Sequence, residues 1–453
     1  GLALSEYEKE WTKHPVLHFD MSGAKHFDKD SLNEYLNHQL LPYEEKYGQN
    51  DDKAEANIRL TNIVRRAFEQ TGQKVVIIID EYDAPLLDVV HDDDNLRNLR
   101  RIIQNFYSPL KMLDPYLEFV FITGITKFSQ LSIFSELNNL YNISMTDQYS
   151  AICGISYSEL TTQMRRDVEL FAEAIGVSYD EMLAKLKDYY DGYHFSRRNM
   201  VDVYNPYSLV NALKSKEIIN FWASSGATSL IPKFVDNVEL RLGKFENCSV
   251  MRNTLELSDV SGGGAELFLY QSGYLPLKES DEFGYILGFP NEEVKQALYE
   301  TVLPALAMRS ENEILSLQAC LYRELGTGQV DEAMKSLKAL IADVPYSNKK
   351  LASMDMEERY RLIISTILNA IGLSVEVERM ISTGRIDMTV KTSRYIYVIE
   401  LKLHNNGGKE AATEQILNRQ YMEPFKADKR KVIGLGIELD EEGKGLLDWK
   451  RAE

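Results

Sequence analysis

The chain has 453 residues, a formal net charge of −18 and 44% hydrophobic residues. Domains usually contain about 100–200 residues, so this length predicts two to four globular domains rather than a disordered chain. Apolar runs such as 75–79 and 119–122 are shorter than the ~18 residues of a membrane span, and the N-terminus has no signal-peptide pattern. A protein coated all over for nucleic acid is basic, so the charge excludes that class.

Three cysteines, Cys153, Cys248 and Cys320, are far apart in the chain and odd in number. Neither a disulfide framework nor a metal site has this spacing. They are typical of incidental or buried thiols in a reducing compartment. We therefore expect a cytoplasmic protein without a membrane span.

The charge is unevenly distributed along the chain. Residues 351–453 contain 16 Lys+Arg and 17 Asp+Glu, so nearly all of the excess negative charge belongs to the first 350 residues. A local basic face for nucleic acid is therefore expected only in the C-terminal segment.

The first 150 residues predict an α/β domain. Residues 16–20 form a short predicted strand, residues 31–72 are helical in pattern, and residues 75–79 are all valine or isoleucine, a β-branched run without polar alternation. A strand of the last kind is typical of a parallel sheet covered on both faces. A helix over 95–113 and an apolar strand over 119–122 follow. This alternation predicts an α/β domain with a parallel sheet.

The middle of the chain, residues 151–345, is predicted to be mostly helical. Aromatic-rich loops are expected at 189–195 and 204–207, and a flexible or tight connection at the Ser-Gly-Gly-Gly of 261–264. A domain boundary is expected near 345–356. We therefore predict three parts, at 1–150, 151–345 and 351–453.

The last hundred residues predict the element order α-β-β-β-α-β. The helices have apolar residues at helical spacing, and the strands are apolar runs bounded by turn residues. The expected elements are a helix at 356–371, strands at 374–380, 386–391 and 395–403, a helix at 410–421 and a strand at 431–438.

Two carboxylates and an amine fall together on these strands. Asp387 ends a Gly-Arg-Ile-Asp segment, and Glu400 and Lys402 lie two residues apart on the next strand, so they project from one face. Buried charges are costly unless they are paired or bound to a metal. Two carboxylates suit Mg²⁺ or Mn²⁺, which polarises a phosphodiester and activates water, while the lysine orients that water. The alternative is a salt bridge on the strand surface.

This segment resembles the PD-(D/E)XK nuclease superfamily, on the strength of Asp387, Glu400-Leu401-Lys402 and the element order. Gly-Arg-Ile-Asp replaces the Pro-Asp of the superfamily name. The resemblance implies a metal-dependent DNA nuclease with Asp387 and Glu400 as metal ligands and Lys402 as a catalytic residue. It also implies an acid on the first helix and accessory residues on the second, for which the candidates are Glu358, with Glu378 as an alternative, and Gln415 and Tyr421.

The predicted strand 75–79 is followed by Asp80-Glu81, which resembles a Walker B motif. The first acid would bind Mg²⁺ through water and the second would orient the water that attacks a nucleoside triphosphate. Thr126, after the next strand, lies where a sensor residue would contact the γ-phosphate. The alternative is a buried strand that ends in an acidic helix cap.

Residues 1 to ~350 resemble the AAA-ATPase-like domain that is often fused to a PD-(D/E)XK domain in bacterial proteins. The resemblance rests on the segments 11–17, 78–85, 121–129, 190–195 and 204–206. No Gly-x-x-x-x-Gly-Lys-Ser/Thr occurs in the sequence, so ATP binding is expected only if a segment upstream of residue 1 supplies that loop.

The combined expectation is an ATPase-like module that regulates a Mg²⁺-dependent DNA nuclease. The alternative is a nucleotide-responsive switch, or a protein that binds nucleic acid or a partner through a degenerate nuclease domain. An oligomer is compatible with either function, and the DNA structure that is cut stays open.

Overall fold

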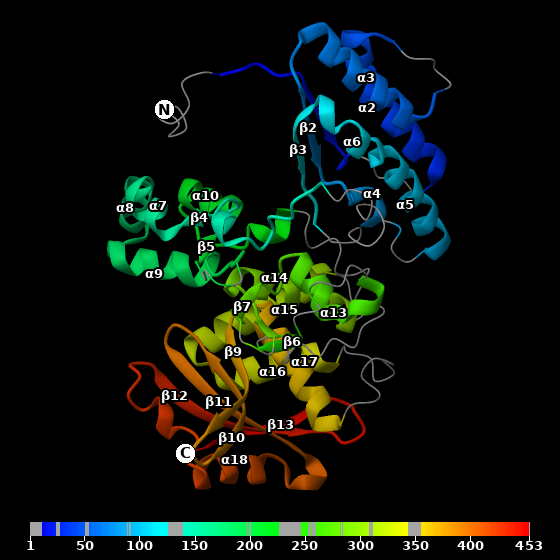
Figure 1. The fold of residues 1–453 in the computed structure, drawn as a ribbon. Helices are drawn as coiled ribbons and strands as arrows, with labels where there is room; N and C mark the ends of the chain where they lie inside the picture. Colours follow the sequence, from blue (N-terminus) through cyan, green and yellow to red (C-terminus); the bar gives the residue numbers. More distant parts are fainter. Residues whose placement is uncertain are drawn as a thin grey trace. The chain divides into compact units, whose positions relative to one another are not determined.

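The computed structural model describes residues 11–23, 28–49, 54–87, 89, 92–125, 139–196, 198, 201–225, 245, 247–251, 255, 260–280, 282, 284–307, 311–342 and 355–452. The chain divides into two compact units (Figure 1). Unit 1 contains Gly1–Ile143 and Arg252–Ser272, and unit 2 contains Ser144–Met251 and Gly273–Glu453. The predicted boundary near 345–356 falls mostly outside the described residues, and the division into three parts stays a prediction.

The sheet of unit 1 has three parallel strands in the order β1-β2-β3, with β1 at Val16–Asp20, β2 at Val75–Asp80 and β3 at Leu117–Ile122. Asp20 is paired with Asp80 in the register of β1 and β2. Because the strands are parallel, their carboxyl ends meet at one edge of the sheet. The predicted parallel α/β sheet is confirmed.

Each of the two long helical stretches predicted in unit 1 is divided in the structure. The first is α2 (Lys29–Tyr47) followed by α3 (Ala56–Thr71), and the second is α5 (Asp93–Tyr107) followed by α6 (Pro109–Met112). A short α4 (Ala84–Leu87) follows β2. Glycines end the first two helices, at Gly48 after α2 and at Gly72, which is left-handed with φ +66°, after α3. A proline begins α6, as is common at the first position of a helix.

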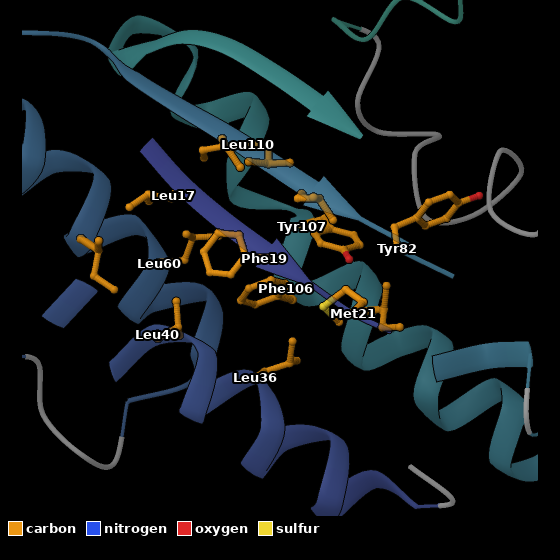
Figure 2. Close-up of a cluster of buried hydrophobic side chains, with 14 of the residues drawn as sticks. Leu17, Phe19, Met21, Leu36, Leu40, Leu60, Tyr82, Phe106, Tyr107 and Leu110 are labelled. Atoms are coloured by element: carbon orange, nitrogen blue, oxygen red, sulfur yellow. The ribbon is translucent and has the colours of Figure 1, made fainter. Parts of the chain in front are cut away.

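The core of unit 1 lies between the sheet and its helices (Figure 2). In β1 the side chains alternate, so that Leu17 and Phe19 are buried while their neighbours are exposed. In β2 one face is fully buried, whereas Val76 and Ile78 on the other face are only half-buried. The strand was predicted to be buried on both faces. One face is fully buried as predicted, and the other is only half-buried.

The part of unit 2 before residue 343 is mostly helical, as predicted, but it also contains short strands. The helices are α7 (Tyr157–Thr162), α8 (Arg165–Ile175), α9 (Tyr179–Tyr190), α10 (Pro206–Ser215), α14 (Glu292–Ala307), α15 (Glu311–Thr327) and α16 (Val330–Ala342). Strands β4 (Ile155–Ser156) and β5 (Val203–Tyr204) pair with each other, and β6 (Cys248–Met251), β8 (Gly284–Leu287) and β7 (Leu277–Ser280) form an antiparallel sheet. Strands this short leave almost no periodic signal in a sequence.

The predicted connection at 261–264 is wrong, because these residues lie within helix α13 (Val260–Gln271) of unit 1. Glycine disfavours a helix by only about 1 kcal/mol per residue, which neighbouring residues can outweigh. The three cysteines carry no disulfide; Cys153 and Cys320 are exposed and Cys248 is partly exposed. Among the described helices, none has the length and apolar character that a bilayer span requires.

The C-terminal part has the predicted order α-β-β-β-α-β, which is confirmed, with one further strand. The elements are α17 (Met356–Ala370), β9 (Ser374–Ile381), β10 (Gly384–Lys391), β11 (Tyr395–Leu403), α18 (Gly408–Asn418), β12 (Lys431–Leu439) and β13 (Leu446–Ala452). The sheet order is β13-β12-β11-β10-β9, with β11 and β12 parallel and the other neighbours antiparallel. Helices α17 and α18 lie on the two sides of this sheet (Figure 1).

Two glycines of β12 allow α18 to approach the sheet closely. A Cβ atom on Gly436 would lie 2.8 Å from the backbone oxygen of Lys409, and one on Gly434 would lie 3.1 Å from the Ile416 side chain. Gly436 is the register partner of Glu400 in β11. The glycine therefore brings α18 directly beside the strand position that carries Glu400.

Candidate functional site

The pairing of β10 with β11 brings the two predicted metal ligands together. The antiparallel register of β10 and β11 ends at the pair Met388 and Ile399, and Asp387 and Glu400 are the positions next to this pair on each strand. Both side chains are buried, with relative exposures of 8% for Asp387 and 1% for Glu400. The backbone N–H of Leu401 donates to Asp387 Oδ2 at 3.0 Å, which holds this carboxylate against the strand that carries Glu400.

Glu400 is the electrostatically unfavourable member of this pair. Its Oε1 accepts a hydrogen bond from Gln415 Nε2 at 2.6 Å, whereas its buried Oε2 has no hydrogen-bond partner among the described residues. Burial raises the pKa of the Glu400 carboxyl well above its usual range, and the charge of Asp387 raises it further. A cation between the two carboxylates would satisfy the open oxygen and remove the repulsion.

Lys402 lies on the same face of β11 as Glu400, as the sequence predicted. Its Nζ is 3.9 Å from Glu400 Oε1, which is an ion pair but too long for a hydrogen bond. The Lys402 side chain is 21% exposed and that of Glu400 is 1% exposed, so Lys402 is the more accessible of the two. The ammonium is therefore available to a molecule that enters from solvent.

Gln415 and Tyr421, the predicted accessory residues, form a chain of hydrogen bonds behind Glu400. Gln415 donates from Nε2 both to Glu400 and to the Tyr421 hydroxyl, the latter at 3.3 Å. Tyr421 is 2% exposed, and a Cβ atom on Gly384 would lie 2.8 Å from its hydroxyl. Gly384 is therefore required for this close approach, which the Gly-Arg-Ile-Asp segment of β10 provides.

A second group of acids lies at the carboxyl edge of the parallel sheet in unit 1. Asp80 ends β2, and the hydroxyl of Thr123, just after β3, donates to its Oδ1. The Glu81 backbone N–H donates to the same oxygen at 3.1 Å. Asp20 lies beside Asp80 in the register of β1 and β2. The predicted residues Asp80 and Glu81 are thus placed next to Thr123, whereas Thr126 lies outside the described residues.

Glu81 has unusual surroundings for a strand-end acid. Its φ is +50°, a region that residues with a side chain seldom occupy. Burial raises the pKa of the Glu81 carboxyl, and the charges of Asp80, Asp20 and Asp83 raise it further. Perturbed acids of this kind are typical of functional sites and also occur in structural networks. Asp20 was not predicted as a site residue, although the sequence showed a short strand that ends in an acid.

Comparison with known families agrees with both resemblances. Residues 1–134 match a family model described as a predicted AAA-ATPase, and residues 355–449 match the PD-(D/E)XK nuclease superfamily model. The chain thus matches an AAA-ATPase-like model at one end and a PD-(D/E)XK nuclease superfamily model at the other, and residues 355–449 are called the nuclease domain below. The recognition made from the sequence is therefore confirmed, and the predicted α/β fold class is confirmed with it.

A curated protein from Azotobacter chroococcum mcd 1 is similar over almost the whole chain. It is described as an uncharacterized protein in the vnfD 5' region and is 28% identical over 454 aligned residues, which cover 97% of this chain and 84% of the relative. No solved structure matches the chain. The similarity therefore extends through both matched segments of this chain, and the description of the relative assigns no activity.

The nuclease domain has an acid of α17 close to the site, but at position 357 rather than 358. The Glu357 carboxylate accepts from the Leu403 backbone N–H and from Asn406 Nδ2, each at 3.3 Å, whereas Glu358 is exposed. Successive residues of a helix point about 100° apart, so only one of two neighbouring acids can face the sheet. Glu358 stays a prediction, and Glu357 is the better placed of the two.

Arg361 is the residue of this site that the sequence pattern did not reveal. Its Nη1 is 3.3 Å from Asp387 Oδ1, and its Nη2 is 3.1 Å from Glu378 Oε1. Arg361 is four residues after Glu357, so both lie on one face of α17. That spacing, together with a helix that packs beside the acidic strands, is the signal that could have identified it.

The residues of the nuclease domain fit a hard divalent cation. Mg²⁺ and Mn²⁺ prefer carboxylate oxygens, and Asp387 and Glu400 present two carboxylates with one buried oxygen that has no hydrogen-bond partner among the described residues. Within the described part of the chain, no three His, Cys, Asp or Glu side chains are grouped closely enough to hold a metal. The protein would therefore supply two carboxylates here, and water would complete the coordination.

Proposed function

We propose that the nuclease domain hydrolyses phosphodiester bonds of DNA with a divalent cation, Mg²⁺ or Mn²⁺, held by Asp387 and Glu400. The observation that supports this most directly is the buried Glu400 Oε2, which has no hydrogen-bond partner among the described residues and lies beside a second carboxylate. Such an arrangement is destabilising in the empty site and favourable once a cation is bound.

The roles of the side chains follow from what holds each of them. The bound cation would polarise the scissile phosphate and lower the pKa of a water. Asp387 is kept in place by the Leu401 N–H, and Glu400 by Gln415. The Lys402 ammonium, which is more accessible than Glu400, would orient the attacking water and stabilise negative charge that develops on the phosphate oxygens.

We further propose that the AAA-ATPase-like domain regulates this activity through a nucleotide. The support is the contact between Thr123 and Asp80 and the position of Glu81 at the same edge of the sheet. Acids at this edge would hold Mg²⁺ and orient water, but a phosphate-binding loop is needed to bind the nucleotide tightly. ATP dependence is therefore expected only of a protein in which such a loop is present.

A plasmid-nicking assay with Mg²⁺ and with Mn²⁺ tests the nuclease proposal. Asp387→Asn, Glu400→Gln and Lys402→Met are each expected to lower the cleavage rate by about 100-fold or more, because each removes a group that acts on the reacting phosphate or on its cation. Glu414→Gln is the matched control, since Glu414 is an exposed acid on α18 next to Gln415, and it should cleave like the wild type. Cleavage that survives in all three site variants would disprove the proposal.

The alternative is a domain that binds nucleic acid without cutting it. The observation in its favour is that no three His, Cys, Asp or Glu side chains among the described residues are grouped to hold a metal, and that Asp387 is already paired with Arg361. A gel-shift experiment separates the two functions. Binding of a DNA duplex that persists in Mg²⁺ without any cleavage product supports the alternative, and an RNA duplex run in parallel identifies the preferred nucleic acid.

A further inference from the structure

We propose that Arg361 serves as a permanent second cation of the nuclease site and thereby limits the site to one divalent ion. The Arg361 guanidinium bridges Asp387 and Glu378. The metal ion would then occupy only the side of Asp387 that faces Glu400. The inference rests on the proposed metal site at Asp387 and Glu400. It makes Arg361 a positioning residue, because it acts on the metal site through Asp387.

Three acids lie in a row across three neighbouring strands. In the pairing of β9 with β10, Arg379 is opposite Ile386 and Val377 is opposite Met388, so Glu378 lies opposite Asp387. Glu400 of β11 lies on the other side of Asp387, one position beyond Ile399, where the register of β10 and β11 ends. Residues opposite each other on paired strands have Cα atoms about 5 Å apart. Three ionised carboxylates at this spacing repel one another unless cations lie between them.

Arg361 supplies one such cation between Glu378 and Asp387. Its two terminal nitrogens reach different carboxylates, Nη1 to Asp387 at 3.3 Å and Nη2 to Glu378 at 3.1 Å, and its side chain is 15% exposed. A guanidinium stays protonated at every pH at which the protein would be used. The positive charge between these two acids is therefore fixed, whereas that of a metal ion depends on the metal concentration.

The backbone of Glu378 is adapted to this bridge. Glu378 has φ +54° within β9, a conformation that residues with a side chain seldom adopt and that persists where the surroundings enforce it. Its Oε1 is 3.1 Å from Arg361 and also 3.1 Å from Arg385 Nη1. The irregular strand position thus directs this carboxylate to two arginines.

The oxygens of the three acids are therefore divided between different partners. Asp387 Oδ1 contacts Arg361 and Asp387 Oδ2 accepts from the Leu401 N–H, while Glu400 Oε1 accepts from Gln415. Among the buried oxygens of these acids, Glu400 Oε2 is without a hydrogen-bond partner in the described part of the chain. In sites with two metal ions the ions lie about 3.5–4 Å apart and share a carboxylate. Asp387 could be shared in this way, but the position between it and Glu378 is filled by the guanidinium.

Counting Mn²⁺ ions bound to the full chain without DNA tests the inference by a measurement that is independent of cleavage. We expect one ion at this site in the wild type, two in Arg361→Gln, and one again in Arg361→Gln combined with Glu378→Gln, which removes the carboxylate that the second ion needs. Arg361→Lys, which keeps the charge, should bind one. Each protein is also measured with the additional substitution Asp387→Asn. The number of ions bound by that form, which lacks the site, is subtracted from the total.

Arg385→Gln is the matched control, because Arg385 contacts the same oxygen of Glu378 at the same 3.1 Å but is 52% exposed and makes no ion pair with Asp387 among the described residues. It should bind one ion with wild-type affinity, whereas Arg361→Gln should bind its first ion about tenfold more tightly because a neighbouring positive charge is gone. Circular dichroism confirms that each variant is folded.

The outcomes separate this inference from the proposed function. Two ions at this site in the wild type, a count that does not depend on any variant folding, overturn the inference and leave the nuclease proposal intact. One ion in the wild type and still one in folded Arg361→Gln also overturn the inference alone. Failure of the wild type to bind any Mn²⁺ that depends on Asp387 overturns both proposals together.

Discussion

Glu400 is a carboxylate kept inside a sheet, at 1% exposure, beside a second carboxylate. Burial of Glu400 without full pairing destabilises the folded protein, since its carboxyl group must either stay charged with few partners or take up a proton on folding. The buried carboxylates therefore lower the stability of the metal-free protein, and a bound cation would restore it. Residues with this property often trade stability for function.

Glu400→Gln is expected to stabilise the metal-free protein and to abolish its stabilisation by Mn²⁺. The amide keeps the shape of the side chain and is neutral without taking up a proton, which the buried Glu400 carboxyl must do on folding near neutral pH because its pKa is raised, so the free energy of unfolding should rise by about 1–2 kcal/mol. Thermal unfolding with and without Mn²⁺ measures both effects. Glu414→Gln, the exposed control on α18, should change neither, and a metal-free Glu400→Gln less stable than the wild type contradicts the prediction.

The sequence predicts the site residues to the extent that local pattern determines them. Strand β11 begins and ends where it was predicted, because its apolar run is long and is bounded by polar residues. Asp387 and Glu400 could be paired from the order of the strands alone. Arg361 and Glu378 could not, because their contact joins a helix to a strand and depends on a positive φ at Glu378 that no residue type signals.

At the scale of whole elements, the sequence predicts long periodic helices and strands well and the boundaries between neighbouring elements poorly. The C-terminal order was predicted correctly, but β13 was missed because Leu446–Ala452 alternates weakly and lies at the edge of the sheet. Proline and glycine divided helices that apolar spacing had merged. Glycines at 261–264 did not prevent a helix, since tertiary packing outweighs propensity.

The contact of α18 with the sheet leads to a prediction about Gly436. Replacing it with alanine would put a Cβ atom 2.8 Å from the Lys409 oxygen and from Thr413, so the helix must move away. We expect a loss of about 1–3 kcal/mol in the free energy of unfolding and a weaker Mn²⁺ affinity, because Gln415 moves with α18. Chemical denaturation and Mn²⁺ titration measure the two. A fully stable variant with unchanged affinity contradicts the close packing.

Helix α14 contains a buried carboxyl that makes the stability of unit 2 depend on pH. Glu293 is 0% exposed, and its Oε1 accepts from the backbone N–H groups of Phe221 at 2.8 Å and Trp222 at 2.9 Å. Burial raises the pKa of Glu293 from 4.5 to about 7. Between these values the folded state binds more protons than the unfolded state, so stability is highest below the lower value and falls as the pH rises to the higher one.

Glu293→Gln should remove this pH dependence, because an amide oxygen can still accept both N–H groups but does not titrate. The wild type is expected to lose about 3 kcal/mol relative to the variant between pH 4.5 and pH 7. Thermal unfolding across this range measures the difference. Glu292→Gln, at the neighbouring position of α14, is the control and should keep the wild-type profile. Parallel curves for wild type and Glu293→Gln exclude the assignment.

At the scale of the whole molecule, each compact unit has its own hydrophobic core, in unit 1 around β1 and β2 and in unit 2 around the helices and the C-terminal sheet. Units with separate cores commonly unfold in separate transitions. We expect calorimetry to resolve two transitions, with the Asp387-dependent stabilisation by Mn²⁺ confined to the transition of unit 2. At 100 times the dissociation constant the stabilisation is about 2.7 kcal/mol. A shift that remains in Asp387→Asn places the ion elsewhere.

Strand β11 is the middle strand of its sheet, with a hydrogen-bonded neighbour on either side. Its backbone is held by two ladders that do not involve the side chains of Glu400 or Lys402. A single substitution of Glu400 or Lys402 can therefore abolish cleavage while the sheet remains folded. Related proteins that have lost the catalytic side chains would therefore keep the same fold. In such proteins the fold alone does not show whether cleavage activity is retained.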